Sequence, residues 1–123
     1  MKPSNRDHPD CQAISDTLQL VGDKWTVLVV SQLGEKTMRF NELRHSIGNI
    51  SQKMLTTTLR QLERDGFVTR TVFPTIPPRV DYTLTDLGCD LLGPVHGLIQ
   101  WAKDNRERME RARERYELRI AAE

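Results

Sequence analysis

Cysteine is scarce in this sequence, and its scarcity excludes two kinds of stabilising site. The two cysteines, Cys11 and Cys89, lie far apart in the chain. One chain therefore has too few thiols for a disulfide framework or for a four-ligand zinc site. The three histidines share no metal-ligand spacing with each other or with the cysteines. The sequence predicts neither a metal site nor a cofactor.

Long apolar runs are also missing. No stretch approaches the ~20 apolar residues that a membrane-spanning helix needs. Residues 1–10 are polar and include Pro3 and Pro9, so they lack the apolar core of a signal peptide. We expect these ten residues to form a disordered arm, and the protein to be cytoplasmic with no membrane partner.

The motifs of common enzyme classes are absent as well. The sequence has no glycine-rich phosphate loop and no nucleophile elbow, and its cysteines and histidines are not paired beyond chance. A thiol peroxidase centred on Cys11 would need an activating arginine and a shaped pocket, which the flanking sequence does not supply. We therefore do not expect an enzyme.

The residues that are present predict a small, mainly helical domain with one β-hairpin. A hydrophobic content of 37% in 123 residues suits one domain with an appended helix. Apolar residues at helical spacing, bounded by capping residues and glycines, predict four helices near 11–21, 23–34, 40–47 and 51–65. Alternating residues then predict two strands joined by a proline-rich loop, at 68–72 and 80–84.

A last helix is expected to begin at Thr85-Asp86, with Gly93-Pro94 weakening it. After residue 102 nearly every residue is charged, which fits either a solvated helix or a frayed end. We therefore divide the chain into an arm (1–10), a folded domain (11–102) and a charged extension (103–123).

This order of elements is typical of a winged helix-turn-helix, in which the second helix of the motif reads the major groove. The exposed residues that would do so are Ser51, Gln52, Lys53, Thr56, Thr57 and Arg60. They carry hydrogen-bond donors and positive charge. Between Lys24 and Val80, nine basic residues accompany four acidic ones, although the whole chain has a net charge of only +1. The alternative is a winged-helix module that binds proteins and not DNA.

Beyond this pattern, the run from Cys11 to Trp101 resembles the HxlR-type transcriptional regulators, a bacterial family. The matching segments occur in the order expected for that family: Cys11, Val21–Thr26, Arg39–Leu43, Ile50–Thr56, Leu59–Glu63, Asp65–Phe67, Pro77–Tyr82 and Leu84–Gly88. The charged tail after Lys103 departs from a typical member.

The resemblance implies an α+β, mainly α winged helix whose extra N- and C-terminal helices form a homodimer on double-stranded operator DNA, in most members as a repressor. It implies that Arg79 in the wing contacts the neighbouring minor groove or a phosphate. It also makes Arg39 and Asn41 plausible contacts to the DNA backbone. Apolar residues of the first and last helices should form the dimer interface: Ile14, Leu18, Leu91, Val95, Leu98 and Ile99.

Cys11 is a candidate sensor, because some members of this family respond to electrophiles, quinones or oxidants through a cysteine near this position. Such a thiol must be accessible and ionised, which the dipole at a helix N-terminus favours. The alternatives are a semi-buried thiol at the dimer interface and a small-molecule effector bound elsewhere. Cys89 is expected to pack in the core.

Overall fold

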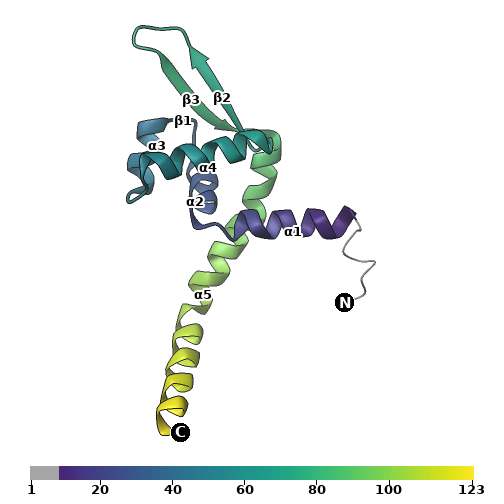
Figure 1. Ribbon diagram of the computed structural model, residues 1–123, viewed down its shortest axis with the longest axis vertical. Helices are drawn as coiled ribbons and strands as arrows, with labels where there is room; N and C mark the ends of the chain where they lie inside the picture. The colour runs from purple at the N-terminus through teal and green to yellow at the C-terminus, as the bar shows by residue number, and fades with distance from the viewer. Residues whose placement is uncertain (1–8) are drawn as a thin grey trace. The chain divides into compact units, whose positions relative to one another are not determined.

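Helices form most of the structure, a computed structural model that describes residues 9–123 (Figure 1). In chain order the elements are α1 (Pro9–Val21), α2 (Lys24–Leu33), β1 (Met38–Arg39), α3 (Phe40–Ile47), α4 (Gln52–Arg64), β2 (Val68–Phe73), β3 (Arg79–Leu84) and α5 (Asp86–Ala122). This is the helix, helix, helix, helix, hairpin, helix order that the sequence predicts. The predicted winged helix-turn-helix fold is confirmed.

Two helices begin where the sequence places a capping side chain. Asp23 precedes α2, and its Oδ1 accepts hydrogen bonds from the N–H groups of Trp25, at 2.9 Å, and Thr26, at 3.2 Å. Ser51 precedes α4, and its Oγ accepts a bond from the N–H of Met54 at 3.0 Å. Each cap satisfies N–H groups that the helix leaves unpaired, for about 1 kcal/mol of stability.

The sheet is small and antiparallel, with the order β1-β3-β2. In the hairpin, Val68 lies opposite Leu84 at the base, and Phe73 lies opposite Arg79 near the loop. The base is buried, since Val68 is 2% exposed, but Val72 near the tip is 51% exposed. The hairpin is therefore buried only at its base, because the tip extends past the helices that form the core.

The core lies between α2, α3, α4 and the base of the hairpin. Val29, Leu43, Leu55 and Leu62 are fully buried there, at 0% exposure. The aromatic side chains Trp25, Phe40 and Phe67 are partly buried and pack against it. The core thus holds the helix-turn-helix and the hairpin in one compact body.

The first helix begins earlier than predicted. It starts at Pro9 and not at Cys11, because proline suits the first turn of a helix, where its missing N–H would have no partner in any case. The predicted disordered arm is therefore wrong for Pro9 and Asp10. Residues 1–8 of that arm lie outside the described residues.

The last helix is continuous from Asp86 to Ala122 and includes Pro94. The charged extension is therefore a helix and not a frayed end. The chain forms one compact unit up to Leu92 and a second from Gly93 to Glu123. A boundary at residue 103 stays a prediction. Across residues 9–123, no helix combines the length and the apolar character needed to cross a membrane.

The start of α5 packs closely against the backbone of Phe67, which lies between α4 and β2. Position 88 of α5 therefore requires glycine. A Cβ on Gly88 would lie 2.3 Å from the carbonyl oxygen of Phe67, whereas a Cβ on Gly97 would meet nothing within 4 Å. We expect Gly88→Ala to lower the free energy of unfolding by about 1–3 kcal/mol through overpacking. Gly97→Ala is the matched control and should raise stability by up to ~1 kcal/mol, because alanine favours helix. Equal effects in urea denaturation would contradict this packing.

Candidate nucleic-acid interface

The connection between α3 and α4 is a tight turn with three anchors. Gly48 adopts a φ of 89°, which favours glycine, and its N–H donates to the carbonyl oxygen of Arg44 at 3.0 Å. Arg44 Nε in turn donates to the carbonyl oxygen of Ile50 at 3.2 Å, and the Ile50 side chain is 3% exposed. The two helices of the motif are thus held at a defined angle.

Helix α4 has one buried and one exposed face. The buried face carries Leu55, Thr58, Leu59 and Leu62. The predicted base-reading residues fall on the other side: Ser51, Gln52, Lys53, Thr57 and Arg60 are exposed and Thr56 is half-buried. On this face the first carboxylate is Glu63, near the end of the helix. The structure therefore presents the predicted residues together on one accessible surface.

A groove runs between this surface and the hairpin. Thr56, Arg60 and Glu63 of α4 line it together with Arg70 and Tyr82, which face each other across β2 and β3. Arg70 was not among the predicted DNA contacts. Its spacing of two residues from Val68 and Val72 places it on the same face of the strand as they are, but only the packing of β2 beside α4 brings that face next to Arg60. Arg70 thus adds a positive side chain beside Arg60 at the edge of the exposed α4 surface.

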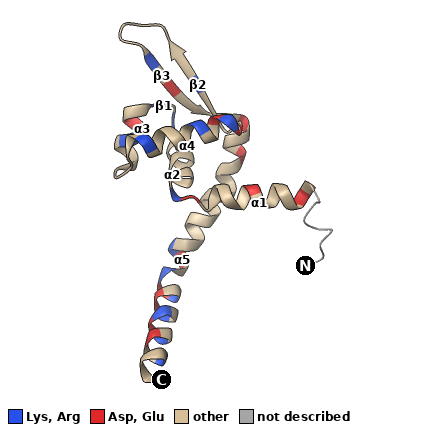
Figure 2. Ribbon diagram, in the orientation of Figure 1, with Lys and Arg blue, Asp and Glu red and all other residues tan. Residues whose placement is uncertain are grey.

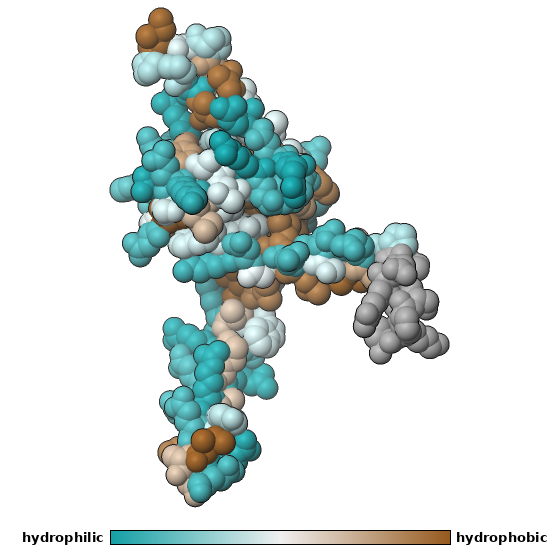
Figure 3. All heavy atoms as spheres, in the orientation of Figure 1, coloured by the Kyte–Doolittle hydropathy of each residue, from teal (hydrophilic) through white to brown (hydrophobic). Residues whose placement is uncertain are grey.

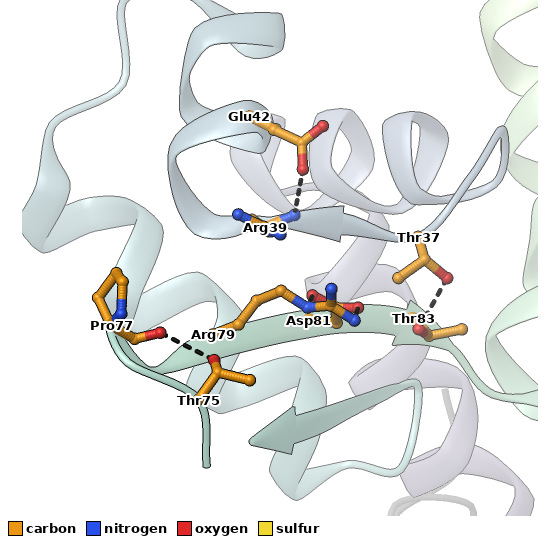
Figure 4. Close-up of polar contacts among 8 residues, drawn as sticks. All are labelled: Thr37, Arg39, Glu42, Thr75, Pro77, Arg79, Asp81 and Thr83. Atoms are coloured by element: carbon orange, nitrogen blue, oxygen red, sulfur yellow. Dashed lines mark hydrogen bonds and ion pairs between the residues drawn. The ribbon is translucent and has the colours of Figure 1, made fainter. Parts of the chain in front are cut away.

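Arg39, Asn41 and Arg79 form a separate group, as Figure 4 shows for the two arginines. All three border a second groove, between the start of α3 and the wing loop. Arg39 and Asn41 are exposed. Arg79 lies on the opposite face of β3 from Tyr82, because successive strand residues alternate. The hairpin therefore separates Arg79 from Arg60 and Arg70.

Arg79 is already engaged within the protein (Figure 4). Its Nε lies 3.3 Å from Asp81 Oδ1, and its guanidinium lies 4.2 Å from the centre of the Phe73 ring. The Asp81 side chain is 19% exposed and the Arg79 side chain 39%. The loop beyond it is closed by the Thr75 hydroxyl, which donates to the carbonyl oxygen of Pro77 at 2.8 Å. Arg79 thus presents a partly neutralised charge in a fixed position.

Lysine and arginine are distributed over α2, α3, α4 and the hairpin, as Figure 2 shows. By contrast, α1 carries Asp10 and Asp16 and no lysine or arginine. The positive excess predicted for residues 24–80 is therefore placed on the elements that carry the two grooves. Such a local excess is the electrostatic requirement for contact with a phosphate backbone.

The cysteines have different surroundings. Cys11 lies in the first turn of α1 and is half-buried. Cys89 lies in the first turn of α5 and is exposed, so its predicted core position is wrong. The apolar spacing of α5 did not show which side of its first turn faces the core. Among residues 9–123, no group of histidine, cysteine, aspartate and glutamate side chains could hold a metal ion.

The apolar residues predicted for the dimer interface are largely uncovered. Ile14 and Leu18 of α1 are 58% and 63% exposed, and Leu98 of α5 is 50% exposed. Leu91 and Ile99 are half-buried and Val95 is buried. Figure 3 shows apolar side chains along one edge of α1. Helix α1 has no fully buried residue; Leu20 packs against the core, whereas Ile14 and Leu18 are accessible to another molecule.

Comparison with known proteins gives a consistent result. The model of the HxlR-like helix-turn-helix family matches residues 20–110. The chain is similar to the HTH-type transcriptional regulator YtfH of Escherichia coli (strain K12), with 42% identity over 73% of this chain and 71% of that protein. Among solved structures, the regulator ytfH from Salmonella typhimurium is 34% identical and matches with a TM-score of 0.76, over 92% of this chain and 97% of that one.

A second similar solved structure is that of a redox regulator. The redox regulator HypR in its reduced form is 38% identical and matches with a TM-score of 0.75, over 80% of this chain and 97% of that chain. The match to the family model, over residues 20–110, spans the helix-turn-helix and the hairpin. It therefore includes both grooves described above.

Proposed function

The chain belongs to the HxlR-like helix-turn-helix family and is a helix-turn-helix transcriptional regulator, and from this premise we propose that it is a homodimeric repressor that binds operator DNA through α4. One observation carries the proposal: the exposed face of α4 presents Gln52, Lys53 and Arg60 with no carboxylate before Glu63. Glutamine pairs with adenine, and lysine or arginine with guanine, at the base edges in the major groove.

The uncovered apolar side chains of α1 and α5 support the dimer. Ile14, Leu18 and Leu98 are each at least half exposed, and burial between two copies would remove this apolar surface from water. Two copies related by a twofold axis would present two α4 helices. Such a dimer binds half-sites about 34 Å apart, which is ~10 base pairs. The operator should therefore be a pseudo-palindrome.

Cys11 supports a response to oxidants or electrophiles. It lies in the first turn of α1, next to the apolar side chains proposed for the dimer interface, and it is half-buried. A change in the size or bonding of this thiol would alter the packing of α1 and so the spacing of the two α4 helices. The similarity to a redox regulator agrees with this role, and a small-molecule effector is the competing one.

The deciding experiment measures binding to the DNA upstream of the chain's own gene and of its divergent neighbour, with the protein reduced and then treated with diamide. We expect selective, salt-sensitive binding that oxidation abolishes and that Cys11→Ser retains after treatment. Cys89→Ser is the matched control and should remain sensitive, because diamide can still oxidise the two Cys11 thiols of a dimer to a disulfide while it is itself reduced to the hydrazine. Binding that ignores diamide would disprove the thiol response alone, whereas no selective binding to either fragment would count against operator binding there.

The wing provides a separate prediction. We expect Arg79→Ala to weaken binding to all sequences and to reduce the slope of log K against log salt by about one, the change for one lost phosphate contact. Asp81→Asn should have the opposite effect, because it removes the carboxylate that neutralises Arg79. Binding measured at several salt concentrations tests both variants. An unchanged slope in both would show that Arg79 does not contact the backbone.

A further inference from the structure

The end of α5 carries a regularly spaced stripe of uncharged residues that the proposed function does not use. Asn105, Met109, Ala112 and Tyr116 follow each other at spacings of four, three and four residues. At 3.6 residues per turn this spacing puts them on one face of the helix. Helix α5 is continuous through this segment. We call these four residues the C-terminal seam.

The seam is accessible in the structure. Tyr116 is 57% exposed, and Met109 and Asn105 are only half-buried. Asn105 is held in place, since its Nδ2 donates to the carbonyl oxygen of Trp101 at 2.8 Å and its Oδ1 accepts from Arg108 at 2.9 Å. A shallow groove along the helix includes Asn105, Met109 and Ala112. The seam is thus an ordered surface that another helix could contact.

Charge is segregated around the seam. Arginine occupies the flanking positions on both sides, at Arg106 and Arg113 on one side and at Arg108 and Arg115 on the other. The glutamates lie on the opposite side of the helix: Glu107, Glu110, Glu114 and Glu117. Along the length of this part of α5 the two signs are interspersed, as Figure 2 shows, and the segregation is between faces around the helix axis. One ion pair joins the flanking Arg106 to Glu110 at 3.9 Å, and a second, on the side away from the seam, joins Arg111 to Glu107 at 3.4 Å.

This charge pattern indicates which kind of molecule could bind the C-terminal seam. In paired helices the residues beside the apolar stripe face the same positions of the partner and set partner choice. A second copy would place arginine against arginine in either orientation, which is unfavourable. A membrane is a poor match, because the stripe is narrow and consists of asparagine, alanine, methionine and tyrosine, whereas interfacial helices bury large apolar faces.

We propose that the C-terminal seam binds an amphipathic helix of a partner protein whose apolar stripe is flanked by glutamate or aspartate. The four flanking arginines would each face a carboxylate, and Met109 and Tyr116 would pack against the partner's apolar residues. This proposal concerns residues 105–116 alone. It does not depend on DNA binding by α4.

The test uses the full chain and two synthetic helices of three heptads, both with leucine in the apolar stripe. One helix has glutamate at the flanking positions and the other has lysine. We expect calorimetric titration to show binding of the glutamate helix only, weakened by added salt. Arg108→Glu with Arg115→Glu should weaken binding of the glutamate helix roughly tenfold or more and create binding of the lysine helix.

Lys103→Glu is the control, because Lys103 lies on the glutamate side of the helix. It should leave the binding of both helices nearly unchanged, and circular dichroism should show equal helix content in all variants. Binding of both synthetic helices alike, or of neither, would overturn the proposal. So would attachment to vesicles of anionic lipid in place of the glutamate helix. A shift from dimer to monomer in Met109→Glu, without binding of the glutamate helix, would assign the seam to a second copy.

Discussion

Replacing Leu55 by alanine is expected to lower the free energy of unfolding by about 2–5 kcal/mol, the range for a large side chain lost from a packed core. Leu55 is 0% exposed on the inner face of α4. Its loss removes buried apolar surface and leaves a cavity among side chains from α2, α3 and the hairpin. Urea denaturation followed by circular dichroism, at one protein concentration, measures the change.

The neighbouring methionine is the matched control. Met54 is also apolar and lies in the same helix, but it is 40% exposed. Met54→Ala should therefore change stability by less than about 1 kcal/mol. If the two substitutions cost the same, the inner face of α4 would not be packed as the structure has it. The contrast also separates loss of folding from loss of DNA contact.

The second large effect concerns DNA recognition. Gln52→Ala combined with Arg60→Ala should reduce binding to the operator by about 1–3 kcal/mol for each side chain, provided that each makes a bidentate contact to a base. Both residues are exposed on the outer face of α4, so the protein should remain folded. Binding to random DNA should fall much less, because base contacts supply specificity and phosphate contacts supply general affinity.

Arg64→Ala serves as the control for lost charge. Arg64 is exposed on the same helix, but it lies 3.6 Å from Asp65 and borders a groove shared with α1. Its loss should leave the ratio of operator to random binding unchanged. Titration of labelled operator and random duplexes gives both affinities. An unaltered ratio in the Gln52 and Arg60 double variant would remove these residues from base recognition.

Much of the fold could be predicted because its signals are local. Asp23 and Ser51 begin α2 and α4 by bonding to N–H groups two or three residues away. The change from helical to alternating periodicity marked the hairpin, and the face of α4 that carries Gln52 and Arg60 followed from the position of its leucines. These features depend on neighbours within one helical turn or one strand.

The errors have a different origin. Cys89 was expected in the core and is exposed, because helical spacing does not say where a helix packs. Arg70 was missed as a neighbour of Arg60, since their proximity depends on how β2 packs beside α4. The two alternatives for the charged tail were equally consistent with its composition, and the structure has a helix there.

By itself the sequence determined the order of elements, their caps, the exposed face of α4 and the likeness to a family of regulators. The tertiary structure alone decided that Arg79 is held by Asp81 and Phe73, on the opposite face of the sheet from Arg70. The physical reason is the distance along the chain between the residues that interact. Periodicity and capping act over a few residues, whereas the pairing of β3 with both β1 and β2 joins residues far apart in the chain and sets which side chains meet.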